Sequence, residues 1–157
     1  MNLPQSFLNA AIKLAAEHSA SGKNGPFGAV IVKNHKIIGQ GWNQVVSAND
    51  PSAHAEIVAI RGACTQLGSH SLTGCTLYTS CEPCPMCLSA SVWARLDKVV
   101  YAETRQGAAM AGFDDERIYQ AFNQKNLEKI ISVQHMPSQA ASNVFISWIN
   151  NESKREY

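Results

Sequence analysis

The fold is decided at Thr76-Leu-Tyr-Thr-Ser-Cys-Glu-Pro-Cys-Pro-Met-Cys87. The β-branched and aromatic residues that open this stretch predict a strand over residues 76–79. The Cys-Glu-Pro-Cys-Pro string that follows opens a helix, because proline is tolerated in the first helical turn. That helix carries apolar side chains, including Met86, Val92 and Trp93. The stretch therefore predicts a strand that leads directly into a helix, as in α/β proteins.

Outward from this stretch, strand and helix patterns alternate. Short apolar runs at residues 27–33 and 37–42 flank Asn34-His35, so a β-hairpin is expected. A helix is expected from Asp50-Pro51 to about Leu67, because Asp caps free N–H groups and Pro tolerates the first helical position. The remaining predicted elements are a first helix at about residues 4–20, strands at Lys98–Ala102 and Ile130–His135, and a loop with a short helix at about residues 104–123. A last helix is expected after Pro137. Its side chains expected to face inward are Val144, Phe145, Trp148 and Ile149. This order predicts a five-stranded sheet covered by helices on both faces.

The composition is that of an ordinary soluble globular protein, with 45% hydrophobic and 16% charged residues. A chain of 157 residues suits one domain with a proper core, and no linker, repeat or low-complexity tract divides residues 1–157. The 13 Lys and Arg residues nearly balance the 12 Asp and Glu residues, for a formal net charge of +1. Nucleic acid is therefore not the expected partner, although a local basic patch can hide in a neutral total.

No window approaches the roughly eighteen consecutive apolar residues that a membrane helix needs, so no membrane partner is expected. Polar residues such as Asn2, Asn9 and Lys13 interrupt the N-terminal region, which does not resemble a signal peptide. The expected compartment is the cytoplasm. There, the five cysteines are more often metal-binding, catalytic or buried than disulfide-bonded.

Candidate metal ligands gather in two short motifs, His54-Ala-Glu56 and Pro83-Cys-Pro-Met-Cys87. Cys84 and Cys87 are close to one helical turn apart, so their sulfur atoms project from the same helix face. With His54 they make three ligands, and three protein ligands leave a position open for water where a structural zinc site closes with four. Both motifs lie in the first turns of helices, where partial positive charge favours thiolate over thiol. A right-handed crossover places neighbouring helix starts at one sheet edge, so the two motifs can share a metal.

Glu56 lies two residues after His54, about 200° around an ideal helix, so the two are not expected to bind the metal together. A carboxylate near a metal but outside its ligand set suits a general base for water. His-x-Glu followed by Pro-Cys-x-x-Cys is recognised as the signature of zinc deaminases. The motif pair predicts one Zn²⁺ per chain, held by His54, Cys84 and Cys87, with Glu56 as the catalytic residue.

Other interpretations of the cysteines and histidines stay open. Cys81 and Cys84 form a second Cys-x-x-Cys that overlaps the first, and such a pair in a cytosolic protein is also typical of a redox site. A redox pair does not require His-Ala-Glu at a helix start, and Pro83 favours Cys84 and Cys87 as the metal pair. An exchange of Cys81 for Cys84 in the ligand set also stays open. The remaining cysteines and histidines are expected in packing or surface positions: Cys64, Cys75, His18, His35, His70 and His135.

At these motifs the sequence resembles the cytidine deaminase superfamily, and within it the bacterial guanine deaminase family. The resemblance covers essentially the whole chain, in the strings Gly25-Pro-Phe-Gly-Ala29, Asn49-Asp-Pro-Ser-Ala-His-Ala-Glu56, Leu77–Cys87, Ala111-Gly-Phe-Asp-Asp115 and Lys154-Arg-Glu-Tyr157. The two metal motifs indicate only a deaminase, whereas Ala111–Asp115 and the terminal Glu-Tyr narrow the resemblance to guanine. The fold it implies is cytidine-deaminase-like, a three-layer α/β/α arrangement with a central mixed five-stranded sheet.

The resemblance implies hydrolytic deamination of guanine to xanthine and ammonia by a zinc-activated water, with Glu56 as proton shuttle. The residues that it implies for binding this small nucleobase are Phe27, Asn43, Ala55, Asp115 and Tyr157. Family members are domain-swapped homodimers. Residues of about 137–157 are therefore expected to close a partner's pocket, with Tyr157 acting across the interface. Asp114 is interpreted as a helix cap.

The preference for guanine has a chemical reason. Guanine offers N1–H and its 2-amino group side by side as donors, and the Asp115 carboxylate only accepts. Adenine has a bare acceptor at N1, which Asp115 repels. Three alternatives stay open: a deaminase of another small base such as cytosine or an amino-triazine, a tRNA adenosine deaminase, and a zinc-stabilised binding module without catalysis. Glu56 disfavours the last, because a closed structural metal site has no use for it.

Overall fold

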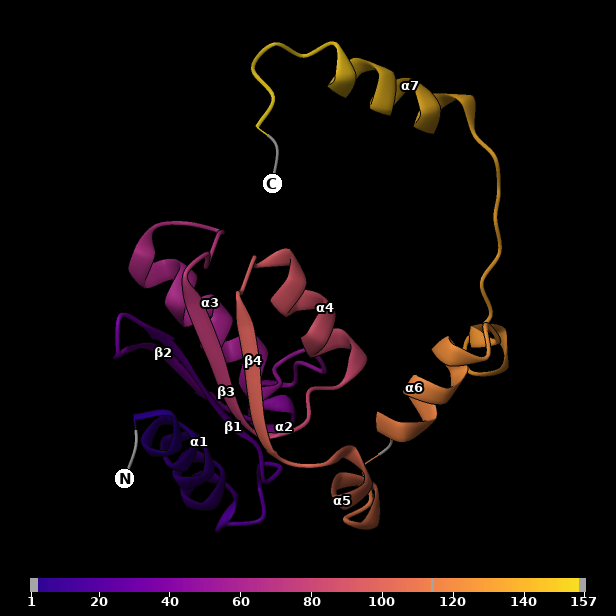
Figure 1. Ribbon diagram of the computed structural model, residues 1–157. Coiled ribbons are helices and arrows are strands. Elements are labelled where there is room, and N and C mark those ends of the chain that lie inside the picture. The colour runs from indigo at the N-terminus through magenta and orange to yellow at the C-terminus, as the bar shows by residue number, and fades with distance from the viewer. Residues whose placement is uncertain (1–2, 114, 156–157) are drawn as a thin grey trace.

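The computed structural model describes residues 3–113 and 115–155 and contains a four-stranded sheet (Figure 1). The strands lie in the order β2-β1-β3-β4, and their bounds are β1 (Gly28–Lys33), β2 (Lys36–Trp42), β3 (Cys75–Cys81) and β4 (Lys98–Glu103). β1 is antiparallel to β2 and β3, whereas β3 and β4 are parallel. A parallel pair needs a crossover, and a helix supplies it here. The sheet is therefore mixed, as the resemblance implies.

The predicted hairpin between β1 and β2 is confirmed. Asn34 and His35 both have positive φ, 48° and 61°. Two successive residues in this region form the two-residue type I′ turn, whose twist matches that of the flanking strands. The turn pairs Lys33 with Lys36 and fixes the register of the hairpin.

Helices cover both faces of the sheet. α1 (Leu3–Ser19) packs on one face, where the ring centroids of Phe7 and Tyr78 lie 5.4 Å apart. α3 (Ala55–Leu67) and α4 (Pro85–Trp93) pack on the other face (Figure 1). The predicted three-layer α/β/α arrangement is therefore confirmed.

Two glycines of β2 bring α3 into backbone contact with the sheet. A Cβ atom at Gly39 would lie 2.4 Å from the carbonyl oxygen of Ala59, and one at Gly41 would lie 2.4 Å from that of Ala55. No side chain tolerates so close an approach, so only glycine lets the α3 backbone lie directly on β2. This packing fixes the first turn of α3, where the His-Ala-Glu motif lies.

The fifth predicted strand is wrong. In the described part of the chain, the 3-10 helix η1 (Leu127–Lys129) ends before residues 130–135, and these residues form no strand. Ile131 and Val133 are 61% and 76% exposed. β-branched residues favour strands, but a strand also needs a neighbouring strand and an apolar surface to cover, and this segment has neither. The mixed sheet has four strands, not five.

The predicted helix start at Asp50-Pro51 is also wrong. A short helix, α2 (Val45–Ala48), and a turn precede α3. The Asp50 carboxylate accepts hydrogen bonds from the N–H (2.8 Å) and hydroxyl (2.6 Å) of Ser52, so it closes that turn instead of capping a helix. α3 begins at Ala55, and His54 is its N-cap residue.

The C-terminal part of the chain consists of the short helices α5 (Arg105–Met110) and α6 (Asp115–Asn123), followed by α7 (Gln139–Ile149). α7 confirms the predicted last helix. Its side chains that were predicted to face inward are instead 45–71% exposed: Val144, Phe145, Trp148 and Ile149. α7 stands apart from the sheet and from α3 and α4 in Figure 1, and it buries none of its residues. None of the helices in the described ranges is long and apolar enough to cross a membrane.

Candidate active site

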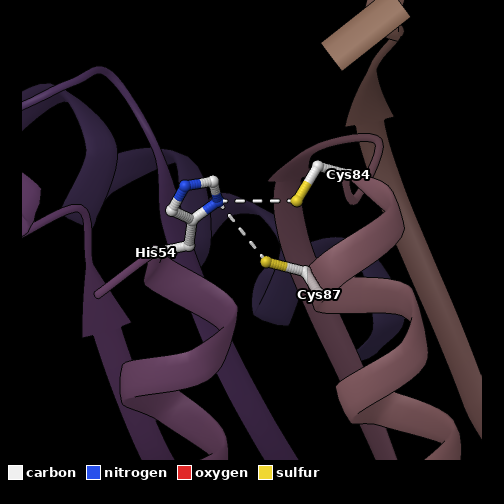
Figure 2. A group of neighbouring side chains, drawn as sticks. All are labelled: His54, Cys84 and Cys87. Atoms are coloured by element: carbon white, nitrogen blue, oxygen red, sulfur yellow. Dashed lines mark hydrogen bonds between the residues drawn. The ribbon is translucent and has the colours of Figure 1, made fainter. Parts of the chain in front are cut away.

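His54 and Cys84 occupy equivalent positions at the starts of neighbouring helices. Each is an N-cap residue with an extended backbone, at ψ 155° and 167°, and neither side chain caps its own helix. The imidazole and the thiol therefore face each other between α3 and α4 (Figure 2). Pro85 occupies the first turn of α4, and Cys87 follows in the same turn. The predicted position of both motifs at helix starts is confirmed.

The three predicted ligands lie at metal-binding distances. His54 Nδ1 is 3.6 Å from Cys84 Sγ and 3.5 Å from Cys87 Sγ (Figure 2), and the ligand atoms all lie within 4.8 Å of one another. A tetrahedral zinc ion, with Zn–N of about 2.05 Å and Zn–S of about 2.3 Å, separates N and S by about 3.6 Å. The donor set and the spacing therefore fit one Zn²⁺. Within the described ranges, no other group of three His, Cys, Asp or Glu side chains is close enough to hold a metal ion.

The pKa values of the two cysteine thiols are shifted in opposite directions. Hydrogen bonding from Cys87, and then from His54, lowers the pKa of Cys84 well below that of an ordinary thiol. The Cys84 thiolate in turn raises the pKa of Cys87, and burial raises it further. The pKa of His54 is raised mainly by its hydrogen bond with Cys84. The lowered pKa therefore favours a thiolate at Cys84, and a bound divalent cation would neutralise its negative charge.

Glu56 lies beside the metal site but outside the cluster of three ligands. Its side chain is 5% exposed, and its Oε1 accepts a hydrogen bond of 3.2 Å from the Thr79 hydroxyl. Burial is the main cause that raises the pKa of its carboxyl group. A carboxyl group with a raised pKa can both accept and return a proton near neutral pH, which is what a general base and acid requires.

A pocket opens at these residues and is lined by Phe27, Asn43, His54, Glu56, Glu82, Cys84, Phe113 and Asp115. The rings of Phe27 and Phe113 meet edge to face, with centroids 4.7 Å apart. The Asn43 Oδ1 accepts hydrogen bonds from the backbone N–H of Gly25 (3.4 Å) and Val45 (3.3 Å). Those bonds orient the amide, so that its Nδ2 is the atom available to donate to a ligand.

Three of the five predicted substrate-binding residues line this pocket: Phe27, Asn43 and Asp115. Ala55 is fully buried in the core against β2 and is not among the lining residues. Tyr157 lies outside the described residues, and so does Asp114.

The other cysteines and histidines lie away from the three ligands. The Cys81 thiol donates to the Thr104 carbonyl at 3.6 Å and is not part of the ligand cluster, and burial raises its pKa to about 11. Cys75 is buried at the start of β3, and the Cys64 thiol contacts the carbonyl of His70. The His18 ring stacks on Trp42 with centroids 3.7 Å apart.

Two lining residues were not predicted. Phe113 lies within the Ala111–Asp115 string that carries the resemblance, so this string could have identified it as a pocket residue. Glu82 lies within the Cys-Glu-Pro-Cys string, but nothing in its residue type distinguishes a pocket-lining carboxylate from a solvated one.

Comparison with known proteins agrees with this geometry. Residues 1–103 match the family "Cytidine and deoxycytidylate deaminase zinc-binding region". The chain is 48% identical to guanine deaminase of Bacillus subtilis over 153 residues, which cover 98% of both chains. It is 39% identical to the tRNA-specific adenosine deaminase of Aquifex aeolicus over 110 residues, which cover 69% of this chain and 72% of the relative.

Solved structures of guanine deaminases resemble the chain as well. The crystal structure of Bacillus subtilis guanine deaminase superimposes with a TM-score of 0.93 at 48% identity, covering 100% of this chain and 99% of that one. A guanine deaminase from Nitrosomonas europaea gives a TM-score of 0.67 at 31% identity, covering 71% of this chain and 65% of that one. The chain belongs to the cytidine and deoxycytidylate deaminase zinc-binding family and, within it, to the bacterial guanine deaminases.

Proposed function

We propose that this protein hydrolyses guanine to xanthine and ammonia. One observation carries the proposal: the Asp115 carboxylate and the Asn43 amide line the same pocket as Glu56 and the metal ligands. The whole-length similarity to Bacillus subtilis guanine deaminase supports the same substrate.

His54, Cys84 and Cys87 would hold one Zn²⁺ per chain. When bound by three protein ligands, zinc supplies Lewis acidity at an open fourth position. Both helix starts direct partial positive charge at the sulfur atoms, so α3 and α4 stabilise the thiolate ligands before any metal binds.

Glu56 moves the protons. Its carboxylate takes a proton from the water that attacks C2 of the purine and returns it to N3. It then takes the proton of the new C2 hydroxyl group and passes it to the 2-amino group, so that the C2–N bond breaks and ammonia leaves. The Thr79 hydroxyl holds Glu56 Oε1 in place during these transfers. Burial raises the pKa of the Glu56 carboxyl group toward neutral pH, which favours both the uptake of the proton and its return.

Asp115 and Asn43 select the base. A carboxylate at Asp115 accepts from N1–H and the 2-amino group of guanine, and the Asn43 Nδ2 donates to an acceptor on the purine. Phe27 and Phe113 form the apolar walls beside the ring. Adenine lacks a proton on N1, so it would leave the Asp115 carboxylate facing a bare acceptor in a buried site.

An ammonia-release assay tests the substrate. Purified zinc-loaded protein is incubated separately with guanine, adenine, cytosine, an amino-triazine and a tRNA anticodon stem-loop. The proposal requires ammonia from guanine at a rate well above the others. Ammonia from cytosine or the triazine but not guanine would overturn the substrate, and release from the stem-loop alone would assign the protein to tRNA editing.

We further propose that residues 1–157 form a single deaminase domain that works as a homodimer, with the segment of about 137–157 exchanged between partners. α7 presents Phe145 and Ile149 at 71% and 64% exposure, and an apolar helix is not stable without a surface to cover. An apolar groove between α3 and α4, lined by Ile60 and Trp93 and at its border by Arg155 of the same chain, offers such a surface on a second copy. Tyr157 would then complete the partner's pocket.

Subunit complementation tests the exchange. A Glu56→Ala chain and a chain ending at residue 153 are each expected to be inactive. When equal amounts are mixed under conditions of subunit exchange, an exchanged dimer recovers about a quarter of the wild-type sites, because the truncated chain borrows an intact tail. No recovery, with heterodimers demonstrated by mass, would show that the tail acts in its own chain.

None of the five cysteines, all of which lie in the described residues, forms a disulfide, as is typical of a reducing compartment, and we propose the cytoplasm.

A further inference from the structure

A polar cluster of Glu82, Arg105, Glu116 and Tyr119, which we name the Arg105 cluster, joins three segments of the chain. Glu82 lies between β3 and α4, in the loop that carries the metal ligand Cys84. Arg105 opens α5, and the other two members belong to α6. None of the four was expected to take part in the site from the sequence.

Arg105 contacts one carboxylate in each of the other two segments, Glu82 and Glu116. Its backbone N–H donates to Glu82 Oε2 at 3.0 Å, and its guanidinium Nη1 lies 3.5 Å from Glu82 Oε1. Its Nε lies 2.8 Å from Glu116 Oε2, but neither atom has a partner in good hydrogen-bond geometry, so this contact is an ion pair without a linear hydrogen bond. The three side chains are only 20–33% exposed, so solvent screens these charges less than at an open surface.

Tyr119 makes the second link between α6 and the metal-binding loop. Its hydroxyl donates to the Pro83 carbonyl at 2.6 Å, one residue before Cys84. The Arg105 guanidinium carbon lies 4.5 Å from the centre of the Tyr119 ring, a cation–π contact. The Arg105 side chain therefore touches the groups that attach α6 to this loop.

The cluster matters because α6 has little other attachment. Among its described residues only Ala121 is buried. Yet Asp115 is its first residue and Phe113 lies just before it, and both line the same pocket as His54 and Cys84. The distance between the two sides of the pocket therefore depends on how firmly α6 is held to the metal-binding loop.

We propose that Arg105 is a positioning residue that holds Asp115 at its working distance from the metal site. The inference rests on the proposed function, because Arg105 acts through Asp115. Without the guanidinium, Glu82 and Glu116 would face each other with no cation between them and with Asp115 close by. Their repulsion would move the start of α6 outward and loosen the side of the pocket that selects guanine.

The test is a double-mutant cycle of Arg105→Met and Asp115→Ala, with kcat and KM for guanine and the zinc content of each variant. Arg105→Met should lower kcat/KM on the order of 10- to 100-fold, mainly by raising KM, since α3 and α4 hold Glu56 and the zinc ligands independently. Lys13→Met is the matched control, because it removes a cation from the exposed Lys13–Glu17 ion pair on the far face and should change nothing.

In the Asp115→Ala background, Arg105→Met should change kcat/KM by less than about twofold, because the group it positions is gone. Glu116→Gln should restore part of the activity of Arg105→Met by removing one of the repelling carboxylates. Additive losses, or loss of zinc from Arg105→Met, would overturn the inference and leave guanine deamination intact. An Asp115→Ala variant with full activity would instead show that the proposed role of Asp115 is wrong.

Arg105→Lys covers the case in which Arg105→Met does not fold. Lysine keeps one positive charge but cannot contact both carboxylates through a planar fork. Its kcat/KM should therefore lie between those of the wild type and Asp115→Ala. A value equal to the wild type would show that charge alone is sufficient and would refute positioning by the guanidinium.

Discussion

Glu56 combines burial with access to the pocket. It is almost fully buried, and it still lines the cavity that holds the metal ligands. Its Oε1 accepts a hydrogen bond from the Thr79 hydroxyl, and the amide oxygen of a glutamine at this position can accept the same bond. Charge and proton transfer at Glu56 can therefore be removed while the shape of the site is retained.

Glu56→Gln is expected to keep one zinc per chain and the wild-type melting temperature but to lower kcat by roughly 10²- to 10⁴-fold, because glutamine accepts no proton from water. Zinc content by mass spectrometry, thermal unfolding and steady-state ammonia release measure the three quantities. A Glu56→Gln variant with wild-type kcat would exclude Glu56 as the proton shuttle.

Cys84→Ser and Cys87→Ser are each expected to lose zinc and activity, because hydroxyl oxygen is a poor ligand where thiolate is required. Cys81→Ser is the matched control, since it lies three residues before Cys84 but outside the ligand cluster. It should keep one zinc per chain. Loss of zinc from Cys81→Ser with retention in Cys84→Ser would exchange the two assignments.

The metal ligands can be predicted from local sequence motifs, whereas most other residues of the site cannot. His54, Cys84 and Cys87 are recognisable because ligand type and local spacing carry the information. Arg105 and Glu82 meet only after β3 and β4 pair in parallel, so no local pattern marks them. Asn43 and Asp115 were found only through the resemblance to a family.

Among the elements, the contact between β2 and α3 positions the catalytic motif most directly. Gly41 lies against the first turn of α3, in which Ala55 immediately follows His54. A side chain at Gly41 cannot be accommodated by a rotamer change, because the obstacle is backbone. The helix must move or the strand must bend.

Gly41→Ala is therefore expected to destabilise the fold by about 1–3 kcal/mol and to lower activity, because it displaces His54 and Glu56 together. Gly62→Ala is the matched control in α3, where an added Cβ meets no atom within 4 Å. It should raise stability by up to about 1 kcal/mol, since alanine favours helix over glycine. Urea unfolding measures both changes, and equal stability of the two variants would contradict the close packing of β2 on α3.

The pattern of elements was predictable where local signals coincided with tertiary contacts. The hairpin at Asn34-His35 and the helix after β3 each have their own turn or proline signal, and both formed as expected. Residues 130–135 carry strand propensity, but they have no neighbouring strand. The Asp50 carboxylate accepts a hydrogen bond from the N–H of Ser52 in a turn and does not cap a helix. Propensity fails at residues 130–135 because a partner strand would have to come from outside the local sequence. At Asp50 a turn partner two residues away, Ser52, takes the place of the helix.

At the scale of the molecule, the metal joins two helices that contact each other sparingly. His54 belongs to α3, whereas Cys84 and Cys87 belong to α4. Bound zinc therefore stabilises the folded chain, because the unfolded chain offers no preformed site.

Removal of zinc with a chelator is expected to lower the melting temperature by roughly 5–10 °C, and added zinc should restore it. The same treatment of Cys87→Ser should have no effect, because that variant has already lost the site. A melting temperature independent of zinc in the wild type would show that the three ligands do not bind metal in solution.

The sequence pattern does not say what the exposed apolar side of α7 covers. Helical periodicity identified α7 and its apolar face, but periodicity does not say which molecule that face covers. The expectation that Phe145 and Trp148 face the core of the same chain was wrong for this reason.

Product analysis in H₂¹⁸O tests the hydrolysis of guanine at C2 most directly. Zinc-loaded wild-type protein should convert guanine to xanthine and ammonia in equal amounts. The xanthine should carry one oxygen atom from the solvent, while Glu56→Gln should form almost none. Consumption of guanine without labelled xanthine, or no consumption at all by protein that holds one zinc per chain, would contradict hydrolysis of guanine at this site.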